Sequence, residues 1–113
     1  IYDKVSALIK KYKPDYVGIE SQYLAVNPNT FRKLCYSVGV IWVAVLLHSN
    51  AKVLILESSK WRKAALGQSG ASKRDVIEQM AKKFKLDPKQ YKDDDFEALG
   101  IAVAVAKLSK LKS

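Results

Sequence analysis

The sequence predicts an α/β domain built on a small parallel sheet, and three observations lead to this prediction. Two short stretches, residues 15–20 and 52–56, have the apolar and β-branched composition of buried strands. The segments around them carry apolar residues at helical spacing. The resulting order of elements, helix–strand–helix–strand and then three helices, is typical of the α/β class.

The first helix is predicted at residues 1–12, where apolar side chains recur at helical spacing until Pro14 ends it. The strand at residues 15–20 finishes on an acid, Glu20. Ligands of open α/β sheets bind beyond the carboxyl ends of the strands, so Glu20 is a candidate site residue. A loop with strong helix breakers follows and carries Tyr23 near its start.

A longer helix is predicted at residues 30–48, and the second strand at residues 52–56. After Val38 the helix is apolar all round, so its later half is expected to be buried. Gly39 is expected to permit close contact with a neighbouring element. The strand has no polar residue at 53–56, which is typical of a strand covered on both faces.

The segment that follows is basic and has two interpretations of equal weight. Trp61 lies among three cations, Lys60, Arg62 and Lys63, as in nucleic-acid-binding segments. The glycine-containing turn at residues 67–71 could then place backbone N–H groups against phosphate. The same pattern fits a surface helix with Trp61 packed inward.

The last two helices are predicted at residues 73–85 and 95–110. Ser72 and Asp75 match a capping box, which predicts where the first of them begins. The second begins inside an acidic cluster, residues 93–97, which holds four of the 11 acidic residues of the chain.

This acidic cluster suits either a helix cap or a metal site. Asp is favoured at helix starts, so capping alone could explain the cluster. Asp94 and Glu97, however, lie on one face of such a helix, as two ligands of one divalent metal would. Glu20 favours the metal interpretation, because acids at a strand end and a helix start can meet at one rim of an α/β sheet. Capping then falls to Asp93 or is an additional duty of the cluster. Mg²⁺ prefers hard oxygen ligands of this kind and can support phosphodiester hydrolysis.

Length and composition predict one domain, residues 1–113. The 20 Lys and Arg residues against 11 Asp and Glu give a net charge of +9, which favours nucleic acid as partner, with an acidic membrane surface next. The longest apolar run has 10 residues, half of the roughly 20 that a membrane crossing needs. One cysteine fits a cytoplasmic setting, and neither a zinc-binding His/Cys cluster nor a GxxxxGK[ST] phosphate loop is present in the sequence.

Three segments, in order, resemble the RuvC-type Holliday-junction resolvases. Residues 14–20, followed by Tyr23, are similar to the family's P-D-x-x-x-I-E-x-x-[FY] segment. Residues 60–73 are similar to its basic, glycine-containing loop and the helix start that follows. Residues 94–102 resemble its last helix, D-x-x-D-A-L-A-I-A, with Glu97 at the second acidic place.

The resemblance implies a ribonuclease-H-like fold and a homodimeric endonuclease that nicks four-way and branched DNA in recombination and repair, with Mg²⁺ or Mn²⁺ as cofactor. It also implies a cytoplasmic, nucleoid-associated protein of a bacterium or phage, with a branch-migration complex as a further partner. The residues at the family's catalytic metal-ligand positions are Glu20, Asp94 and Glu97. The resemblance places Tyr23, which would stack on an unpaired base, and Lys73 at DNA-contacting positions, and either Arg62 or Lys63 at a further one. Lys60 belongs to the same basic segment and is assigned to DNA as well.

Three departures from the family pattern accompany this resemblance. Glu97 stands where many members carry Asp, and Ser69 replaces a glycine of the loop. The family's first catalytic Asp lies on a strand that is expected to precede Ile1, so the chain is expected to be N-terminally incomplete. The alternative function is therefore a non-catalytic nucleic-acid-binding or dimerisation module.

Overall fold

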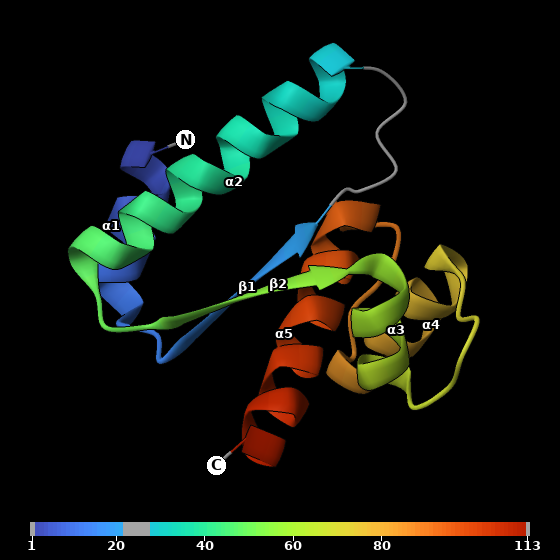
Figure 1. Ribbon diagram of the computed structural model, residues 1–113. Helices are drawn as coiled ribbons and strands as arrows, with labels where there is room; N and C mark the ends of the chain where they lie inside the picture. The colour runs from blue at the N-terminus through green and yellow to red at the C-terminus, as the bar shows by residue number, and fades with distance from the viewer. Residues whose placement is uncertain (1, 22–27, 113) are drawn as a thin grey trace. The chain divides into compact units, whose positions relative to one another are not determined.

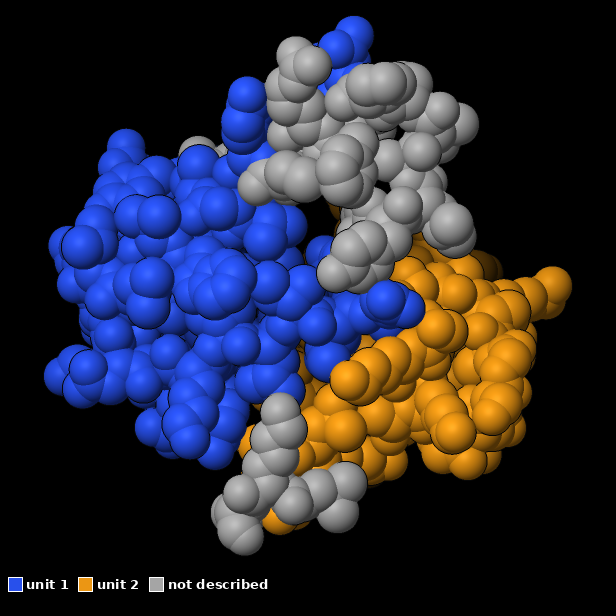
Figure 2. Space-filling view, viewed as in Figure 1, with its two compact units in different colours: residues 1–57 blue, residues 58–113 orange. Residues whose placement is uncertain are grey.

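The computed structural model describes residues 2–21 and 28–112 of the chain. Its elements follow the predicted order of helices and strands (Figure 1). The chain divides into two compact units, Ile1–Glu57 and Ser58–Ser113, each held together by its own internal contacts (Figure 2). None of the described helices is long and apolar enough to cross a membrane.

The first unit contains a parallel pair of strands, β1 (Tyr16–Ser21) and β2 (Lys52–Glu57). In their register Tyr16 lies opposite Lys52, and Glu20 lies opposite Leu56. A hydrogen bond from the Lys52 N–H to the Asp15 carbonyl, 2.9 Å long, extends this pairing by one residue. The predicted strands are thus confirmed to within one residue at their ends, and so is their parallel direction.

Two helices complete the first unit, α1 (Tyr2–Tyr12) and α2 (Pro28–His48). They pack against each other, and the Tyr2 hydroxyl lies 3.0 Å from Nε2 of His48, which joins the start of α1 to the end of α2. The buried apolar side chains of this unit are Ile9, Ile19, Ala44, Val45 and Leu56.

The expectation that the later half of α2 is buried is wrong. Ala44 and Val45 are fully buried, but Leu46 and Leu47 are 64% and 66% exposed. Within the first unit α2 packs against α1 and contacts β1, and these two elements leave Leu46 and Leu47 uncovered. An all-round apolar pattern therefore leaves apolar side chains exposed.

Two smaller expectations for this unit are also wrong. A Cβ atom added at Gly39 would meet nothing within 4 Å, so this glycine is not required for a close contact. On β2, Leu56 is buried but Ile55 is 38% exposed, so the strand is not covered on both faces.

The second unit consists of α3 (Ser58–Leu66), α4 (Lys73–Phe84) and α5 (Asp93–Lys112). The helix α5 packs against both α3 and α4. The largest side chains of its core are completely or almost completely buried, and they are Trp61, Val76, Met80 and Phe96. Trp61 therefore packs inward from a helix, as one of the two interpretations of the basic segment predicted. The nucleic-acid role of the cations beside it stays a prediction.

The helix α5 approaches side chains of α3 and α4 closely at Gly100. A Cβ atom there would lie 2.6 Å from Cζ3 of Trp61 and 3.2 Å from Cγ1 of Val76. Real Cβ atoms do not approach other atoms to 2.6 Å, so the absence of a side chain at Gly100 lets α5 close onto the Trp61 ring.

Candidate functional site

The acidic start of α5 is stabilised by one of its own carboxylates. Oδ2 of Asp95 accepts a hydrogen bond from the Lys92 N–H at 3.0 Å, just ahead of the first helical residue, Asp93. This contact satisfies a donor that the helix leaves unpaired at its N-terminus. Of the two alternatives for the cap, Asp93 or an additional duty of the acidic cluster, the structure shows the second, because Asp95 stands three residues after Lys92 and can reach back to it. Asp94 is exposed.

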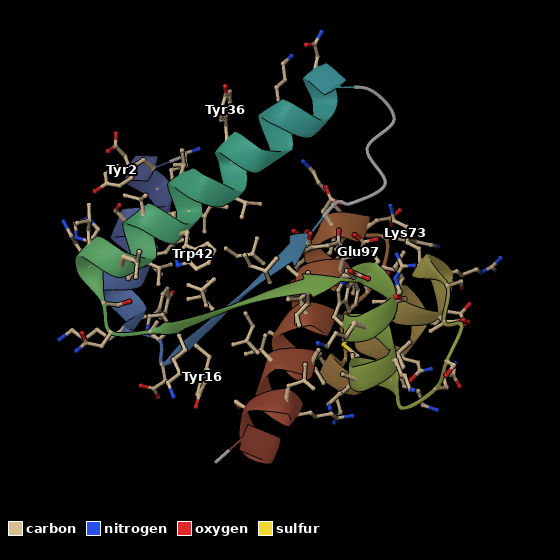
Figure 3. The ribbon with its side chains drawn as sticks, in the orientation of Figure 1. Tyr2, Tyr16, Tyr36, Trp42, Lys73 and Glu97 are labelled. Atoms are coloured by element: carbon tan, nitrogen blue, oxygen red, sulfur yellow. The ribbon has the colours of Figure 1, made fainter. Side chains whose placement is uncertain are left out.

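Glu97 lies one turn further along α5 and contacts two cations from two other helices. Its Oε1 atom is 3.8 Å from Nη2 of Arg62 on α3 and 3.7 Å from Nζ of Lys73 on α4. Figure 3 shows the Lys73 and Glu97 side chains beside each other. The side chain of Glu97 is only 17% exposed, against 23% for Arg62 and 51% for Lys73. Glu97 is therefore a largely buried carboxylate between two basic groups.

Packing places Arg62 at this position. Its neighbour Trp61 is fully buried and fixes the face that α3 turns towards α5. The Arg62 guanidinium carbon lies 5.5 Å from the centre of the Trp61 ring. The Nε atom of Arg62 is buried, and no hydrogen-bond partner for it is present among the residues that the structure describes.

A capping box places Lys73 at the first residue of α4. The Ser72 hydroxyl accepts a hydrogen bond from the Asp75 N–H at 3.1 Å, and the Asp75 carboxylate accepts one from the Ser72 N–H at 2.9 Å. The hydrogen bond from the Ser72 backbone, followed by that with its hydroxyl, lowers the pKa of Asp75 below its usual 3.8. The predicted capping box is confirmed, and α4 ends at Phe84, followed by the C-cap residue Lys85, whose φ of 56° is left-handed.

Three further candidate residues lie on β1 and α3. Glu20 is the next-to-last residue of β1 and is half-buried within the first unit. Lys60 and Lys63 are exposed on α3. Tyr23 lies outside the described residues.

The donor chemistry of the α5 start fits a divalent metal in part. Across residues 2–21 and 28–112, no group of three or more His, Cys, Asp or Glu side chains is gathered as a metal site. The second unit does supply two carboxylates, Asp94 and Glu97, at the spacing i, i+3. Mg²⁺ is commonly held by one or two carboxylates together with water and substrate phosphate oxygens, so these two groups fit such an ion.

Comparison with solved structures defines the class of the fold. The chain superimposes on "T. thermophilus RuvC in complex with Holliday junction substrate" with a TM-score of 0.87 over 98% of this chain and 67% of that one, at 19% identity. A second structure, "Thermus thermophilus RuvC structure", gives a TM-score of 0.84 over 98% of this chain and 66% of that one, also at 19% identity. This class is the ribonuclease-H-like α/β fold, as predicted.

Sequence comparison identifies the family within that class. The profile of the family described as "Crossover junction endodeoxyribonuclease RuvC" matches residues 1–106, and the chain belongs to this family. The relative from Treponema denticola is 35% identical over 109 residues, which cover 96% of this chain and 60% of that protein. The relative from Natranaerobius thermophilus is 27% identical over 113 residues, which cover all of this chain and 70% of that protein. The chain thus spans about three fifths of the Treponema protein.

The contact between Glu97 and its two cations is a feature that the sequence did not predict. All three residues were candidates, but Arg62 and Lys73 were assigned to DNA rather than to a carboxylate. The pairing depends on how α3 and α4 pack against α5, and no local sequence pattern encodes that packing. The sequence does show that Glu97 is opposite in charge to Arg62 and Lys73, but opposite charge alone does not predict which residues contact each other.

Proposed function

We propose that this protein is a structure-specific DNA endonuclease that resolves four-way junctions by metal-dependent hydrolysis of phosphodiester bonds. The family of the chain supports this proposal, and so does the bound substrate named for the Thermus thermophilus relative, a Holliday junction. The observation that carries it is the start of α5, where exposed Asp94 and shielded Glu97 lie one turn apart beside two basic side chains.

In this proposal Asp94 and Glu97 hold a divalent cation, Mg²⁺ or Mn²⁺. A bound ion of this kind supplies a more acidic water and stabilises the leaving oxygen. Asp94 is exposed and can reach an ion that arrives with the substrate. Glu20 is proposed as a further catalytic carboxylate. Its support is its place at the carboxyl end of β1 and the similarity of its segment to the family pattern.

Basic side chains of the second unit are proposed to bind the DNA backbone. Lys60 and Lys63 are exposed on α3, and Lys73 is half-exposed at the start of α4. Lysines at such positions contribute sequence-independent phosphate contacts, which agrees with the net charge of +9. Arg62 is assigned to the same surface, and Tyr23 to an unpaired base at the junction.

We further propose that the protein acts as a homodimer. Four side chains at helical spacing form an exposed apolar face on α2, and they are Tyr36, Val40, Val43 and Leu47. Tyr36 projects away from the helix in Figure 3. An apolar stripe of this kind is suited to a second copy of itself, because a two-fold interface pairs the same patch on both subunits. We propose that the protein acts on DNA in the cytoplasm. A branch-migration complex is proposed as a further partner.

The test of this function is cleavage of a labelled four-way junction by the complete gene product. We expect paired nicks that require Mg²⁺ or Mn²⁺ and stop in EDTA, and much slower cutting of a linear duplex of the same sequence. A protein that binds the junction but does not cut it with either metal would support a non-catalytic binding module instead.

A further inference from the structure

Glu97 is engaged by groups that the proposed function assigns to DNA. One carboxylate oxygen of Glu97, Oε1, pairs with both cations: it lies 3.8 Å from Nη2 of Arg62 and 3.7 Å from Nζ of Lys73. The three residues come from α3, α4 and α5, whose packing within one unit fixes the contact. In the DNA-free protein, Arg62 and Lys73, which are proposed to bind phosphate, are thus the counter-ions of Glu97, which is proposed to bind the metal.

The ion pairs of Glu97 with Arg62 and Lys73 compete electrostatically with metal binding by Glu97 and with phosphate binding by the two cations. A cation a few ångströms from a carboxylate makes that carboxylate a poorer ligand for a second cation, because like charges repel at short range. The same carboxylate weakens the attraction of Arg62 and Lys73 for phosphate. Glu97 and Arg62 are largely shielded from water, at 17% and 23% exposure, so solvent screens their interaction less than it screens an exposed pair.

A second ion pair of the same unit provides the contrast. Arg74 and Glu78 lie at i, i+4 on α4, 3.3 Å apart, with side chains that are 87% and 63% exposed. This pair is solvated and contains no residue assigned to metal or DNA. It therefore gives matched control positions for the charge changes at Glu97.

We propose that Arg62 and Lys73 are exchangeable counter-ions of Glu97. A DNA phosphate that takes over these two cations frees Glu97 for a divalent ion, and an ion bound at Glu97 frees the two cations for phosphate. Phosphate and metal consequently bind with positive cooperativity, and linkage requires the coupling to be the same in both directions. This inference rests on the proposed function in assigning Glu97 to metal and Arg62 and Lys73 to DNA.

The first test measures junction binding in EDTA, where neither cleavage nor metal contributes. Glu97→Gln keeps the shape of the side chain and removes the charge that holds the two cations. We expect it to tighten junction binding about three- to tenfold, whereas Glu78→Gln changes binding less than about twofold. In a Lys73→Gln background the gain from Glu97→Gln should fall to about half or less. The control is Lys83, an exposed lysine in the last turn of α4, and in a Lys83→Gln background the gain should be retained.

The second test measures divalent affinity by calorimetry with Ca²⁺ or Mn²⁺ on the DNA-free protein. We expect Lys73→Gln to bind the ion about three- to tenfold more tightly than wild type, and Lys83→Gln to match wild type. Equal metal affinity for both lysine variants would overturn the inference. The inference would also be overturned if Glu97→Gln did not tighten junction binding in EDTA. The same holds if Glu97→Gln tightened it equally in the wild-type and Lys73→Gln backgrounds. Both tests measure binding and not cleavage. Failure of the proposed nuclease function, seen in the junction-cleavage assay, can therefore be distinguished from failure of this inference.

Discussion

At the scale of single residues, Gly100 shows how closely α5 packs against α3. The Trp61 ring is fully buried and has no room to move away from an added Cβ atom 2.6 Å distant. We expect Gly100→Ala to lower the free energy of unfolding by about 1–3 kcal/mol, since overpacking outweighs the better helix propensity of Ala. Urea denaturation followed by circular dichroism would measure this change.

Gly39 is the matched control, because it also lies within a helix but a Cβ atom there would meet nothing within 4 Å. Gly39→Ala should therefore be neutral or stabilise the protein by up to about 1 kcal/mol. Equal stability of the two alanine variants would contradict the packing described for Gly100.

Asp75 gives a residue-level prediction for pH. Its pKa is lowered in the folded protein by the hydrogen bonds with Ser72, so its ionised form stabilises the fold. This contribution is complete above the unfolded pKa of about 3.8 and is lost as the pH falls through the lower, folded pKa. Wild type should exceed Asp75→Ala in stability at pH 6, and the difference should shrink between pH 4 and pH 2 in denaturant titrations. A difference that grows towards low pH would show that this sign is wrong.

At the scale of elements, α4 depends on its N-terminal cap. Ser72→Ala removes the acceptor of the Asp75 N–H bond and should lower the midpoint of thermal unfolding by about 3–6 °C. Ser109→Ala is the control, because its hydroxyl donates to the Ala106 carbonyl within α5 and caps nothing. The cap would be unimportant if both variants melted at the same temperature.

The exposed face of α2 predicts self-association. A charge at Val43 or Leu47, which are 48% and 66% exposed, should disrupt an apolar interface without disturbing the fold of the monomer. We expect Leu47→Glu to turn a dimer into a monomer at micromolar concentration in sedimentation velocity. Phe84→Glu, at a 42% exposed apolar position on α4, should remain dimeric. A monomeric wild type at these concentrations would refute the proposed dimer.

Local patterns of the sequence predicted which elements form but not how each is covered. Apolar spacing predicted both strands and the helices at residues 1–12, 30–48, 73–85 and 95–110, and the Ser72–Asp75 box fixed the start of α4. The helix α3 was only one of two interpretations of the basic segment. The same apolar content led to a wrong expectation for α2, because periodicity does not tell whether a neighbouring element covers a face. The role of Gly39 was misjudged for a related reason, since close approach depends on residues distant in the sequence, as Gly100 shows with Trp61, 39 positions away.

The candidate site was predictable to a similar degree. The residue types and their spacing made Asp94 and Glu97 candidates, the family resemblance added Lys73, and the family profile spans all three positions. The ion pairs at Glu97 depend on three helices that meet in space, so they required the structure.

At the scale of the whole molecule, the charge of +9 predicts that electrostatics dominate DNA binding. The logarithm of the junction affinity should fall linearly with the logarithm of salt concentration. Lys60→Gln should weaken binding of junction and duplex alike and reduce the magnitude of that slope by about 1. Anisotropy titrations at several salt concentrations would measure it, with Lys83→Gln as a control outside the assigned DNA surface. A slope equal to that of wild type would remove Lys60 from the proposed surface.

The most direct test of the nuclease proposal is junction cleavage by Asp94→Asn and Glu97→Gln in the complete gene product. Each change removes a carboxylate assigned to the metal and keeps the size of the side chain. We predict at least a hundredfold loss of Mg²⁺-dependent nicking by both variants, with junction binding no weaker than that of wild type and with Glu78→Gln as active as wild type. Nicking by both variants at the wild-type rate would contradict the assignment of the α5 carboxylates to catalysis.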